Sequence, residues 1–427
     1  MFKRVLIANR GEIAVRIIRA CQEMGIETVA VYSDEDADAM HVRLADYSYN
    51  IGPADASESY LNIDALMEAA ERTEADAVHP GYGFLSEDAD FAEMVTKAGM
   101  TWIGPWADTI RKVGDKDEAR AAMVPSGIPM SKGSTPLTSL EDAIEQAKDV
   151  GYPIILKPVA GGGGKGMLIA NSEEDLRNIL NIIDINKVKY YFEHYIEHSR
   201  HIEVQIVADN YGHVIHLGER ECSLQRRNQK LLEESPSIAL TPDRRAEVGA
   251  LAIKAAKSVH YNNIGTVEFL LDLKTNQFNF MEINPRIQVE HGVTEAVTGI
   301  DLVRTQIRIA AGESLDLQQE DVKFTGHAIE CRINAEDPDN NFMPSPGKID
   351  FFLEPGGPRV RVDSGVCAGL SISPYYDSLI AKIVVHGRTR GDAIKIMRRA
   401  LNEFKVGGIK TTIPLHQRIL KNEYFCT

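Results

Sequence analysis

The chain has 427 residues, of which 44% are hydrophobic and 26% are charged, enough for two or three globular domains with buried cores. Its net charge of −15 argues against a general nucleic-acid binder. Five scattered cysteines without a CxxC pair exclude a disulfide framework and a cysteine zinc site. No apolar stretch is long enough to span a membrane, and the one at the N-terminus is too short for a signal peptide. We therefore expect a cytoplasmic protein.

The first 112 residues alternate apolar runs with amphipathic segments, which is typical of a parallel α/β unit. Strands are expected at 5–8, 28–32, 77–79 and 101–103, and helices at 12–23, 62–72 and 88–98. Asp34 follows Gly11 at a spacing that suits a dinucleotide site, but the turn around Gly11 lacks the second and third glycines of that motif. We therefore expect a Rossmann-like fold without that cofactor.

Residues 113–200 predict a small, glycine-hinged unit of the kind that closes over a site as a lid. A connecting segment is expected at 110–135, and the unit after it contains expected strands at 153–157 and 168–170. Its two helices carry N-terminal cap signals, Thr138 with Glu141 and Ser172 with Asp175, and the first of them is expected to end at Gly151. From residue 201 to the end the pattern is strand-rich.

A run of four glycines, Gly161 to Gly164, precedes Lys165 between the two expected strands of the lid. Glycines let backbone N–H groups approach phosphate oxygens, and the lysine adds positive charge. The run is not a Walker A loop, because no Ser or Thr follows the lysine and a strand comes next. A flexible hairpin is the alternative, and Lys157 alone would be read as a solvated lysine.

A hairpin is predicted from strands 266–272 and 278–284. If Asp272 pairs with Phe278, then Leu270 faces Phe280, and Glu268 faces Glu282. Two carboxylates about 5 Å apart repel unless a cation lies between them. Asn284 shares their face, and oxygen ligands of this kind suit Mg²⁺ or Mn²⁺ bridging the phosphates of a nucleotide. Two exposed glutamates on a hairpin are the alternative.

Basic residues form a third group. Its members are Arg220, Arg226, Arg227, Lys230, Arg286 and Arg332. A bidentate arginine suits a planar anion, although a run such as RRNQK is usually a solvated face. His201 and His291, taken singly, are more often structural than catalytic.

Taken together, the motifs resemble an ATP-grasp enzyme of the biotin carboxylase family. They are ANRGEIAVRIIRA at 8–20, HPGYGFLSE at 79–87, GDK at 114–116, GGGGKGM at 161–167, HIEVQ at 201–205, ERECSLQRRNQK at 219–230, EINPRIQVEH at 282–291, ECRINAE at 330–336 and PYYDS at 374–378. The resemblance implies an α/β and α+β chain with an ATP-grasp fold: a Rossmann-like N-terminal domain at 1–112, a linker and mobile lid at 113–200, and the catalytic core with the C-terminal domain at 201–427.

The resemblance also implies a role for each matching residue. ATP would be held by Lys116, Lys157, Gly162, Gly163, Gly164, Glu193, His194, Tyr195, Ile196, His201, Gln225, Asn228 and Glu268. The metal ions would bind Glu268, Glu282 and Asn284, and bicarbonate would lie among Lys230, Arg286, Gln288 and Val289. Glu290 would be the base, Arg332 would stabilise the biotin enolate, and Lys230 and Arg286 complete the expected catalytic set.

The implied reaction is ATP-dependent carboxylation of biotin by bicarbonate, through carboxyphosphate, on a biotin carboxyl carrier protein. No Met-Lys-Met biotinylation site is present, so we expect the carrier and the carboxyltransferase to be separate subunits within an acyl-CoA or pyruvate carboxylase. We also expect a homodimer, with no nucleic acid or membrane partner. Another ATP-grasp carboxylate–amine ligase and an inactive nucleotide-binding scaffold are the alternatives.

Three residues depart from the usual family pattern. Asn228 replaces a frequent His, His194 a usual Lys, and Gly292 a usual Pro. These departures bear on the adenine pocket and on the affinity for ATP. The family normally continues with a short segment beyond the position of Thr427.

Overall fold

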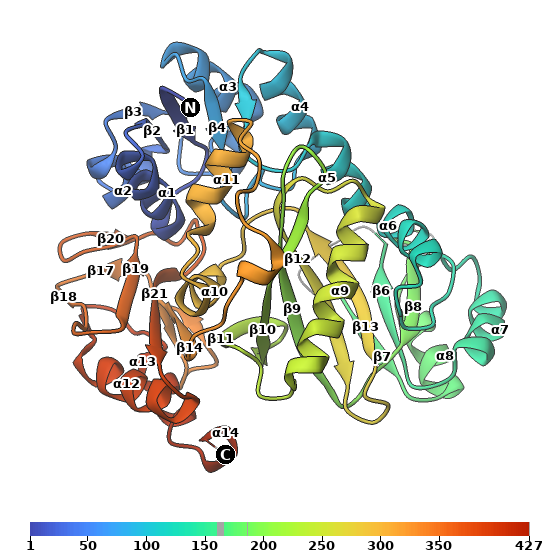
Figure 1. Cartoon of the computed structure of the whole chain (residues 1–427). Coiled ribbons are helices and arrows are strands. Elements are labelled where there is room, and N and C mark those ends of the chain that lie inside the picture. The colour runs from blue at the N-terminus through green and yellow to red at the C-terminus, as the bar shows by residue number, and fades with distance from the viewer. Residues whose placement is uncertain (160–165, 186, 427) are drawn as a thin grey trace.

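The computed structural model describes residues 1–159, 166–185 and 187–426 (Figure 1). An N-terminal parallel sheet has the order β3-β2-β1-β4-β5. Its strands are β1 Arg4–Ile7, β2 Glu27–Tyr32, β3 Tyr47–Asn50, β4 Ala77–His79 and β5 Thr101–Trp102. Its helices are α1 Gly11–Glu23, α2 Met40–Leu44, α3 Ile63–Arg72 and α4 Ala89–Lys97. The central strands are buried on both faces, as their continuous apolar runs indicate.

The expected strands and helices of this part are confirmed to within about one residue at either end, but the helix α2, an edge strand and two helices after it were missed. The edge strand β3 (Tyr47–Asn50) has the mostly exposed sequence YSYN, which gives no apolar run to detect. The segment 110–135 was wrongly predicted to be a plain connection. It contains the end of helix α5 (Ala107–Gly114) and all of α6 (Lys116–Met123), and Asp115 caps α6 by accepting from two backbone N–H groups.

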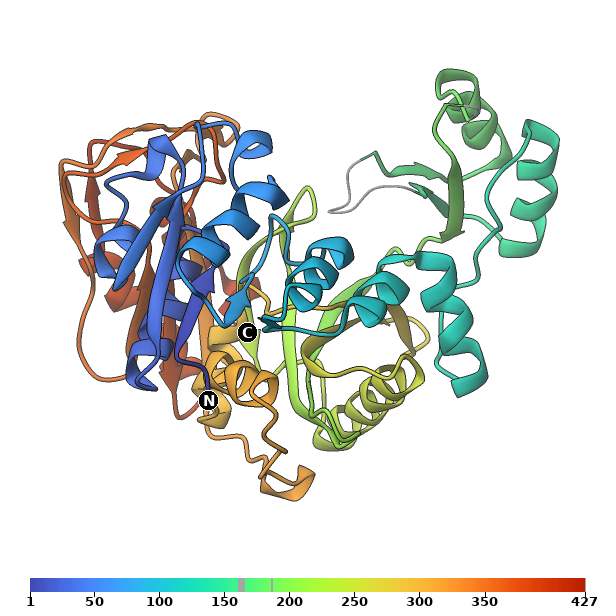
Figure 2. The same cartoon turned by 90° about the horizontal axis from the view of Figure 1, so that it is seen from above.

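A small unit projects from the rest of the molecule in Figure 2. Its antiparallel sheet, β7-β6-β8, carries the helices α7 and α8. The elements are β6 Ile154–Pro158, β7 Leu168–Ala170, β8 Tyr190–His194, α7 Leu140–Val150 and α8 Glu173–Ile182. The predicted cap at Ser172 is confirmed, since its hydroxyl accepts from Asp175 N at 3.2 Å.

The predicted cap at Thr138 is wrong by one residue. Ser139 caps α7 by accepting from Asp142 N, because the Asp142 carboxylate takes the hydroxyl and N–H of Thr138 and holds that residue outside the helix.

An antiparallel sheet of eight strands forms the rest of the molecule, in the order β13-β12-β9-β10-β11-β14-β21-β19. Its strands are β9 Ser199–Ala208, β10 Val214–Arg226, β11 Gln229–Ser235, β12 Asn263–Asp272, β13 Phe278–Asn284, β14 His327–Asn334, β19 Val360–Ser364 and β21 Leu379–Gly387. The helices packed with it are α9 Pro242–Ser258, α10 His291–Thr298, α11 Leu302–Ala310 and α12 Arg390–Glu403. Shorter elements complete the chain: β15 Glu336–Asp337, β16 Met343–Pro344, β17 Gly347–Lys348, β18 Phe351–Leu353, β20 Ser371–Ile372, β22 Lys405–Gly407, α13 Ile413–Ile419 and α14 Glu423–Cys426. The strand-rich prediction is right, but it missed the helices.

The β12–β13 hairpin corrects the predicted register. Glu268 does pair with Glu282, but Phe280 faces Phe269 rather than Leu270, and Phe278 faces Leu271 rather than Asp272. A bulge between these pairs places one extra residue, Met281, on β13. The two glutamates therefore remain neighbours although the strand ends are shifted.

Candidate active site

A row of charged residues crosses four neighbouring strands of the large sheet. Glu282 on β13 pairs with Glu268 on β12, Glu268 pairs with Glu203 on β9, and Glu203 pairs with Arg220 on β10. Residues that pair directly across strands present their side chains on the same face, about 5 Å apart. The register alone therefore brings three carboxylates and a guanidinium together.

Lys230 lies on the next strand, β11, and its ammonium reaches the carboxylates of this row. Its ammonium donates to Glu203 Oε1, to Glu290 Oε1 at 2.8 Å and to Glu268 Oε1 at 3.3 Å. Burial alone would lower the pKa of Lys230, but the three carboxylates raise it well above its usual value. Lys230 is therefore a fixed positive charge, as buried carboxylates require.

The carboxylates around Lys230 differ in their pKa values. Burial, and then the charge of Glu290, raise the pKa of Glu203 to about 8. Burial acts in the same direction on Glu268, but Lys230 and His201 outweigh it and lower the pKa of Glu268. Glu203 is therefore a carboxyl group of this cluster that can hold a proton at neutral pH.

Glu290 lies at the N-terminus of α10 and is fully buried between two cations. Lys230 contacts its Oε1, and Arg332 on β14 donates to its Oε2 at 2.9 Å. These cations overcome burial and hold the pKa of Glu290 well below its usual value. Arg332 also donates to Glu233 at 2.6 Å, so its guanidinium is held from two sides.

The loop between β13 and α10 carries the remaining anion-binding candidates. Arg286 donates to Glu87 of the N-terminal part, to Gln288 Oε1 at 2.9 Å and to Asn284 Oδ1 at 3.3 Å. Gln288 and Asn284 in turn donate to Glu268 Oε1, at 3.1 and 2.9 Å. The loop, the hairpin glutamates and Lys230 thus form one hydrogen-bonded cluster.

Glu282 lies beside this cluster with a solvent-exposed side chain. The surrounding protein partly desolvates the Glu282 carboxylate, and the negative charges of Glu268 and Glu87 also oppose its ionisation. The pKa of Glu282 is therefore raised. A divalent cation between Glu282 and Glu268 would relieve this repulsion. These oxygens, with the amide oxygen of Asn284, fit the ligand preference of Mg²⁺.

His201 closes the cluster on the side of the lid. Its Nε2 lies 2.8 Å from Glu268 Oε2, and its Nδ1 lies 2.9 Å from Gln225 Nε2. Burial opposes protonation, but the carboxylates of Glu268 and Glu203 raise the pKa of His201.

The lid and α6 present a second set of the predicted residues. Lys157 on β6 donates to Glu193 Oε2 at 2.7 Å, and Arg120 on α6 donates to Glu193 Oε1 at 2.8 Å. The ammonium of Lys116 lies 5.8 Å from the centre of the Tyr191 ring. The predicted Gly162, Gly163 and Gly164 lie outside the described residues.

Three predicted lid residues follow Glu193. The ring of His194 contacts the Gly151 carbonyl at 3.0 Å, the N–H of Tyr195 donates to Pro153 O at 2.8 Å, and the Ile196 carbonyl accepts from Ser199. The side chain of His194 is thus engaged within the lid.

Asn228 occupies the tip of the β10–β11 hairpin. Arg226 pairs with Gln229, so Arg227 and Asn228 form a two-residue turn, and both have positive φ, 48° and 65°. Asparagine is among the few residues that adopt this conformation readily. The departure from the family pattern at Asn228 therefore agrees with the local backbone.

Sequence reasoning missed two residues of the site, Glu203 and Arg120. Glu203 stands in HIEVQ, where alternate residues share one face of a strand, so His201 already pointed to it. Arg120 lies in the segment that was predicted to be a plain connection, so no signal placed it beside Glu193.

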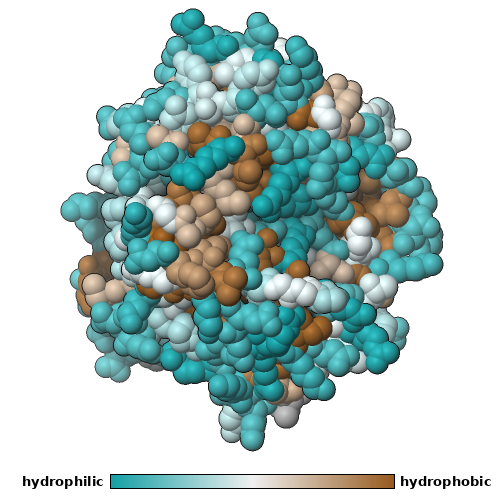
Figure 3. Space-filling view, turned by 90° about the vertical axis from the view of Figure 1, so that its left-hand side faces the viewer, coloured by the Kyte–Doolittle hydropathy of each residue, from teal (hydrophilic) through white to brown (hydrophobic). Residues whose placement is uncertain are grey.

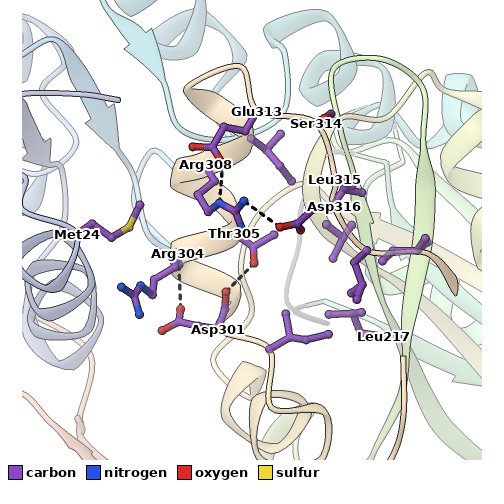
Figure 4. Close-up of a pocket in the computed structure, with 15 residues that line it drawn as sticks. Met24, Leu217, Asp301, Arg304, Thr305, Arg308, Glu313, Ser314, Leu315 and Asp316 are labelled. Atoms are coloured by element: carbon purple, nitrogen blue, oxygen red, sulfur yellow. Dashed lines mark hydrogen bonds and ion pairs between the residues drawn. The ribbon is translucent and has the colours of Figure 1, made fainter. Parts of the chain in front are cut away.

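A separate cavity of about 430 Å³ lies away from this cluster (Figure 4). It lies between α11, residues 313–317 and the apolar side chains of Val207, Ile215 and Leu217. Arg308 at its edge is paired with Glu313 and Asp316. None of the predicted site residues that the structure describes lines it.

Comparison with known proteins identifies the family of the chain. Three family descriptions match: "Biotin carboxylase, N-terminal domain" over residues 1–110, "Carbamoyl-phosphate synthase L chain, ATP binding domain" over 115–318, and "Biotin carboxylase C-terminal domain" over 330–427. Biotin carboxylase 1 of Bacillus subtilis (strain 168) is 55% identical over 100% of this chain and 96% of that protein. The chain belongs to the biotin carboxylase family.

Other members of the biotin carboxylase family are similar over the same length. A pyruvate carboxylase subunit of Methanothermobacter thermautotrophicus is 48% identical over 100% of this chain and 88% of that protein. The biotin carboxylase domain dimer of Hydrogenobacter thermophilus 2-oxoglutarate carboxylase, solved with MgADP, ADP and bicarbonate, is 48% identical, with a TM-score of 0.95 over 100% of this chain and 95% of that one. The predicted family and ATP-grasp fold are therefore confirmed.

Gly292, the third departure from the family pattern, lies in the first turn of α10. A Cβ atom at this position would lie 2.9 Å from Glu330 Oε2 and 2.9 Å from Val384 Cγ2. Glycine therefore lets α10 pack closely on the sheet.

Proposed function

We propose that this chain catalyses the ATP-dependent carboxylation of biotin by bicarbonate, the first half-reaction of a biotin-dependent carboxylase. The observation that carries the proposal is the meeting of two cations, Lys230 and Arg332, on the buried carboxylate of Glu290. An anionic substrate can bind there only if it takes over contacts from Glu290.

Bicarbonate suits this exchange. When the anion enters between Lys230 and Arg286, it competes with Glu290 for positive charge, and the pKa of Glu290 rises towards its usual value. Glu290 can then accept the proton of bicarbonate. An oxygen of the resulting anion attacks the γ-phosphorus of ATP, the bond to the β–γ bridging oxygen breaks, and ADP and carboxyphosphate form.

Arg332 would act in the second step. Carboxyphosphate breaks down to CO₂ and phosphate, the phosphate takes the ureido proton of biotin, and the biotin nitrogen attacks CO₂. The enolate oxygen formed in this step needs a cation whose charge does not depend on pH, and a guanidinium provides it.

ATP would be held between the lid and the large sheet. We assign Lys116, Lys157, the glycine loop, Glu193 to Ile196, His201, Gln225 and Asn228 to this role, and we add Arg120 because it shares Glu193 with Lys157. We assign Mg²⁺ or Mn²⁺ to Glu268, Glu282 and Asn284. When bound, the ion offsets the negative charge of the phosphate groups.

We further propose that residues 1–112, 113–200 and 201–427 are the functional domains and that the protein acts in the cytoplasm. The scattered cysteines, all free in the structure, support a reducing location. Within the described residues, no helix combines the length and the apolar character that a membrane span requires.

The partners we propose are a biotin carboxyl carrier protein, a separate carboxyltransferase chain and a second copy of this chain. Relatives named as subunits support the first two, and a relative solved as a dimer supports the third. The face in Figure 3 gathers apolar residues among hydrophilic ones. It is seen from the side of β18, where Phe351 and Leu353 are about half exposed, which is consistent with a contact between copies.

Replacing Glu290 by Gln tests the proposed base. Bicarbonate-dependent ATP cleavage stimulated by free biotin should fall by about 10²- to 10⁴-fold, the usual contribution of a general base, while nucleotide affinity stays nearly unchanged. Phosphate release and ADP titration measure the two quantities. Glu247→Gln is the control, because Glu247 pairs with Arg244 outside the cluster.

Two outcomes would contradict the proposal. ATP cleavage by the unaltered chain without stimulation by biotin would indicate another carboxylate–amine ligase. Nucleotide binding without any ATP cleavage would indicate an inactive scaffold.

A further inference from the structure

A buried lysine outside the cluster contacts the loop that carries Glu290. Lys382 lies on β21 with its side chain fully buried. In register it lies between Arg332 on β14 and Asp363 on β19. An ammonium group in such a place needs acceptors for its charge, and the identity of those acceptors indicates its role.

The shortest contact of Lys382 is to the backbone. Its Nζ donates to the Val289 carbonyl at 2.6 Å, whereas Glu12 Oε1 lies at 3.2 Å and Asp363 Oδ2 at 3.9 Å. Asp363 already has a bidentate partner, Arg361, at 2.9 and 2.7 Å. Neutralising Asp363 therefore does not account for the position of the ammonium, which holds the Val289 carbonyl as well as pairing with Glu12.

The Val289 carbonyl bears directly on Glu290. This carbonyl and the N–H of Glu290 belong to one planar peptide group, so a contact that fixes the carbonyl also fixes the orientation of the chain at Glu290. The preceding carbonyl, that of Gln288, lies 2.9 Å from Nδ1 of His291. Two successive carbonyls of the loop are thus held from the protein interior.

The same ammonium joins the loop to the N-terminal part of the molecule. Glu12 lies in the first turn of α1, and its Oε1 accepts a hydrogen bond from the hydroxyl of Tyr82. Lys382 therefore links three segments that lie far apart in the sequence.

We propose that Lys382 is a positioning residue for the proposed bicarbonate activation: through the Val289 carbonyl it holds Glu290 where it can take the proton. The proposal rests on the proposed function of Glu290. The loop geometry, and with it the use of bicarbonate, then depends on one side chain from β21.

The test compares two variants that both lack the Glu12 carboxylate and differ only at Lys382. Lys382→Met alone would leave Glu12 buried without its cation, so the test variant is the double change Lys382→Met with Glu12→Gln. The control is Glu12→Gln alone, which keeps the ammonium and its contact with Val289. Both are full-length chains, and both retain Arg361 beside Asp363.

Steady-state kinetics give the first measurement. We expect kcat/KM for bicarbonate to fall on the order of tenfold to a hundredfold in the double variant relative to the control, because a small misplacement of a catalytic group costs this much. The KM for MgATP should stay within about twofold, because Lys382 does not contact the residues assigned to ATP. Equal losses in both variants, or a parallel rise in both KM values, would show a merely structural role.

Hydrogen exchange of the amides at 288–293 gives a measurement that does not depend on turnover. Exchange there should be faster in the double variant than in the control, with β1 and β4 unchanged. Unchanged exchange in the loop would overturn the proposal. Faster exchange with an unaltered KM for bicarbonate would overturn its catalytic part. If the wild-type chain does not cleave ATP with bicarbonate, the proposed function fails, and the exchange experiment still decides whether Lys382 holds the loop.

Discussion

The buried charged side chains of the site are each held by partners of opposite charge. Arg332 illustrates this, because its side chain pairs with Glu233 and Glu290 while its backbone carbonyl is held separately. Thr412 Oγ1 donates to that carbonyl at 2.9 Å, and His416 Nε2 lies 2.7 Å from it. A neutral imidazole is sufficient as the donor.

The titration of His416 leads to a prediction about pH. Burial lowers its pKa from 6.5 to about 4, so the unfolded chain binds a proton more readily than the folded protein between these pH values. The stabilisation is fully present above pH 6.5 and is lost as the pH falls towards 4. Between pH 7 and pH 5 we expect this histidine to account for about 2 kcal/mol of the loss in unfolding free energy.

Urea unfolding of the wild type and of His416→Gln at both pH values measures this contribution. Glutamine can donate to the Arg332 carbonyl but does not titrate, so the variant should lose about 2 kcal/mol less than the wild type between pH 7 and pH 5. Equal losses in the two proteins would refute the assignment.

The chemistry of single residues was predictable where a motif carries it. Strand pairing predicted that Glu268 and Glu282 share a cation, whereas the roles of Lys230 and Glu290 came from the family resemblance. Glu203 was missed: alternation placed it on the same face as His201, but the sequence does not say that β9 lies beside β12 rather than beside another strand. The paired register of Glu203 and Glu268 is a property of the sheet.

Among the elements, the β10–β11 hairpin carries several site residues and depends on its turn. Arg226 packs over the Phe342 ring at 4.0 Å and donates to the Asn341 carbonyl at 3.0 Å, which ties the hairpin to the C-terminal part. Lys230 follows the turn by two residues, so the conformation of the turn sets where its side chain leaves the strand.

Changing Asn228 tests the turn. The φ of 65° is strained for a residue with a Cβ atom and a non-polar side chain, so Asn228→Ala should lower the unfolding free energy by about 1 kcal/mol. Asn228→Gly should stay within a few tenths of the wild type, since glycine adopts this conformation freely. Chemical denaturation measures both. An alanine variant as stable as the glycine variant would contradict the strain argument.

The elements also show where local signals mislead. Apolar periodicity found the buried strands and the helices of the N-terminal part, but a bulge such as that at Met281 leaves no trace in a two-residue alternation. The Ser139 cap was misplaced because Thr138 offers the same hydroxyl one residue earlier. At this helix the Asp142 carboxylate, which binds Thr138, decided between two equivalent caps.

In the whole molecule, the first and last parts of the chain meet near the site. Arg16 on α1 pairs with Glu295 of α10 at 3.0 Å, and Glu295 pairs with Arg361 of β19 at 2.6 Å. Gly365, directly after β19, lies against the backbone of α1: a Cβ atom there would lie 2.5 Å from Glu12 N and 2.6 Å from Gly11 C.

Gly365→Ala tests this close approach. Both neighbours are backbone atoms that cannot turn aside, so the new methyl group should destabilise the protein by about 3 kcal/mol or lower its thermal midpoint by several degrees. Gly356→Ala is the matched control, because a Cβ atom at that exposed position meets nothing within 4 Å. Thermal unfolding of both variants decides the point, and similar midpoints would contradict it.

The eight-stranded sheet has a consequence for how this chain can be divided. The matched family descriptions end at residue 318 and resume at 330, yet β11 and β14 are hydrogen-bonded neighbours, with Leu232 opposite Cys331. A fragment that stops before β14 would leave β11 with an open edge, a template on which further chains can add as extra strands. The boundary that sequence comparison draws between the two matched domains therefore falls inside one continuous sheet. Cutting the chain there would give two fragments with exposed strand edges, and both would tend to aggregate.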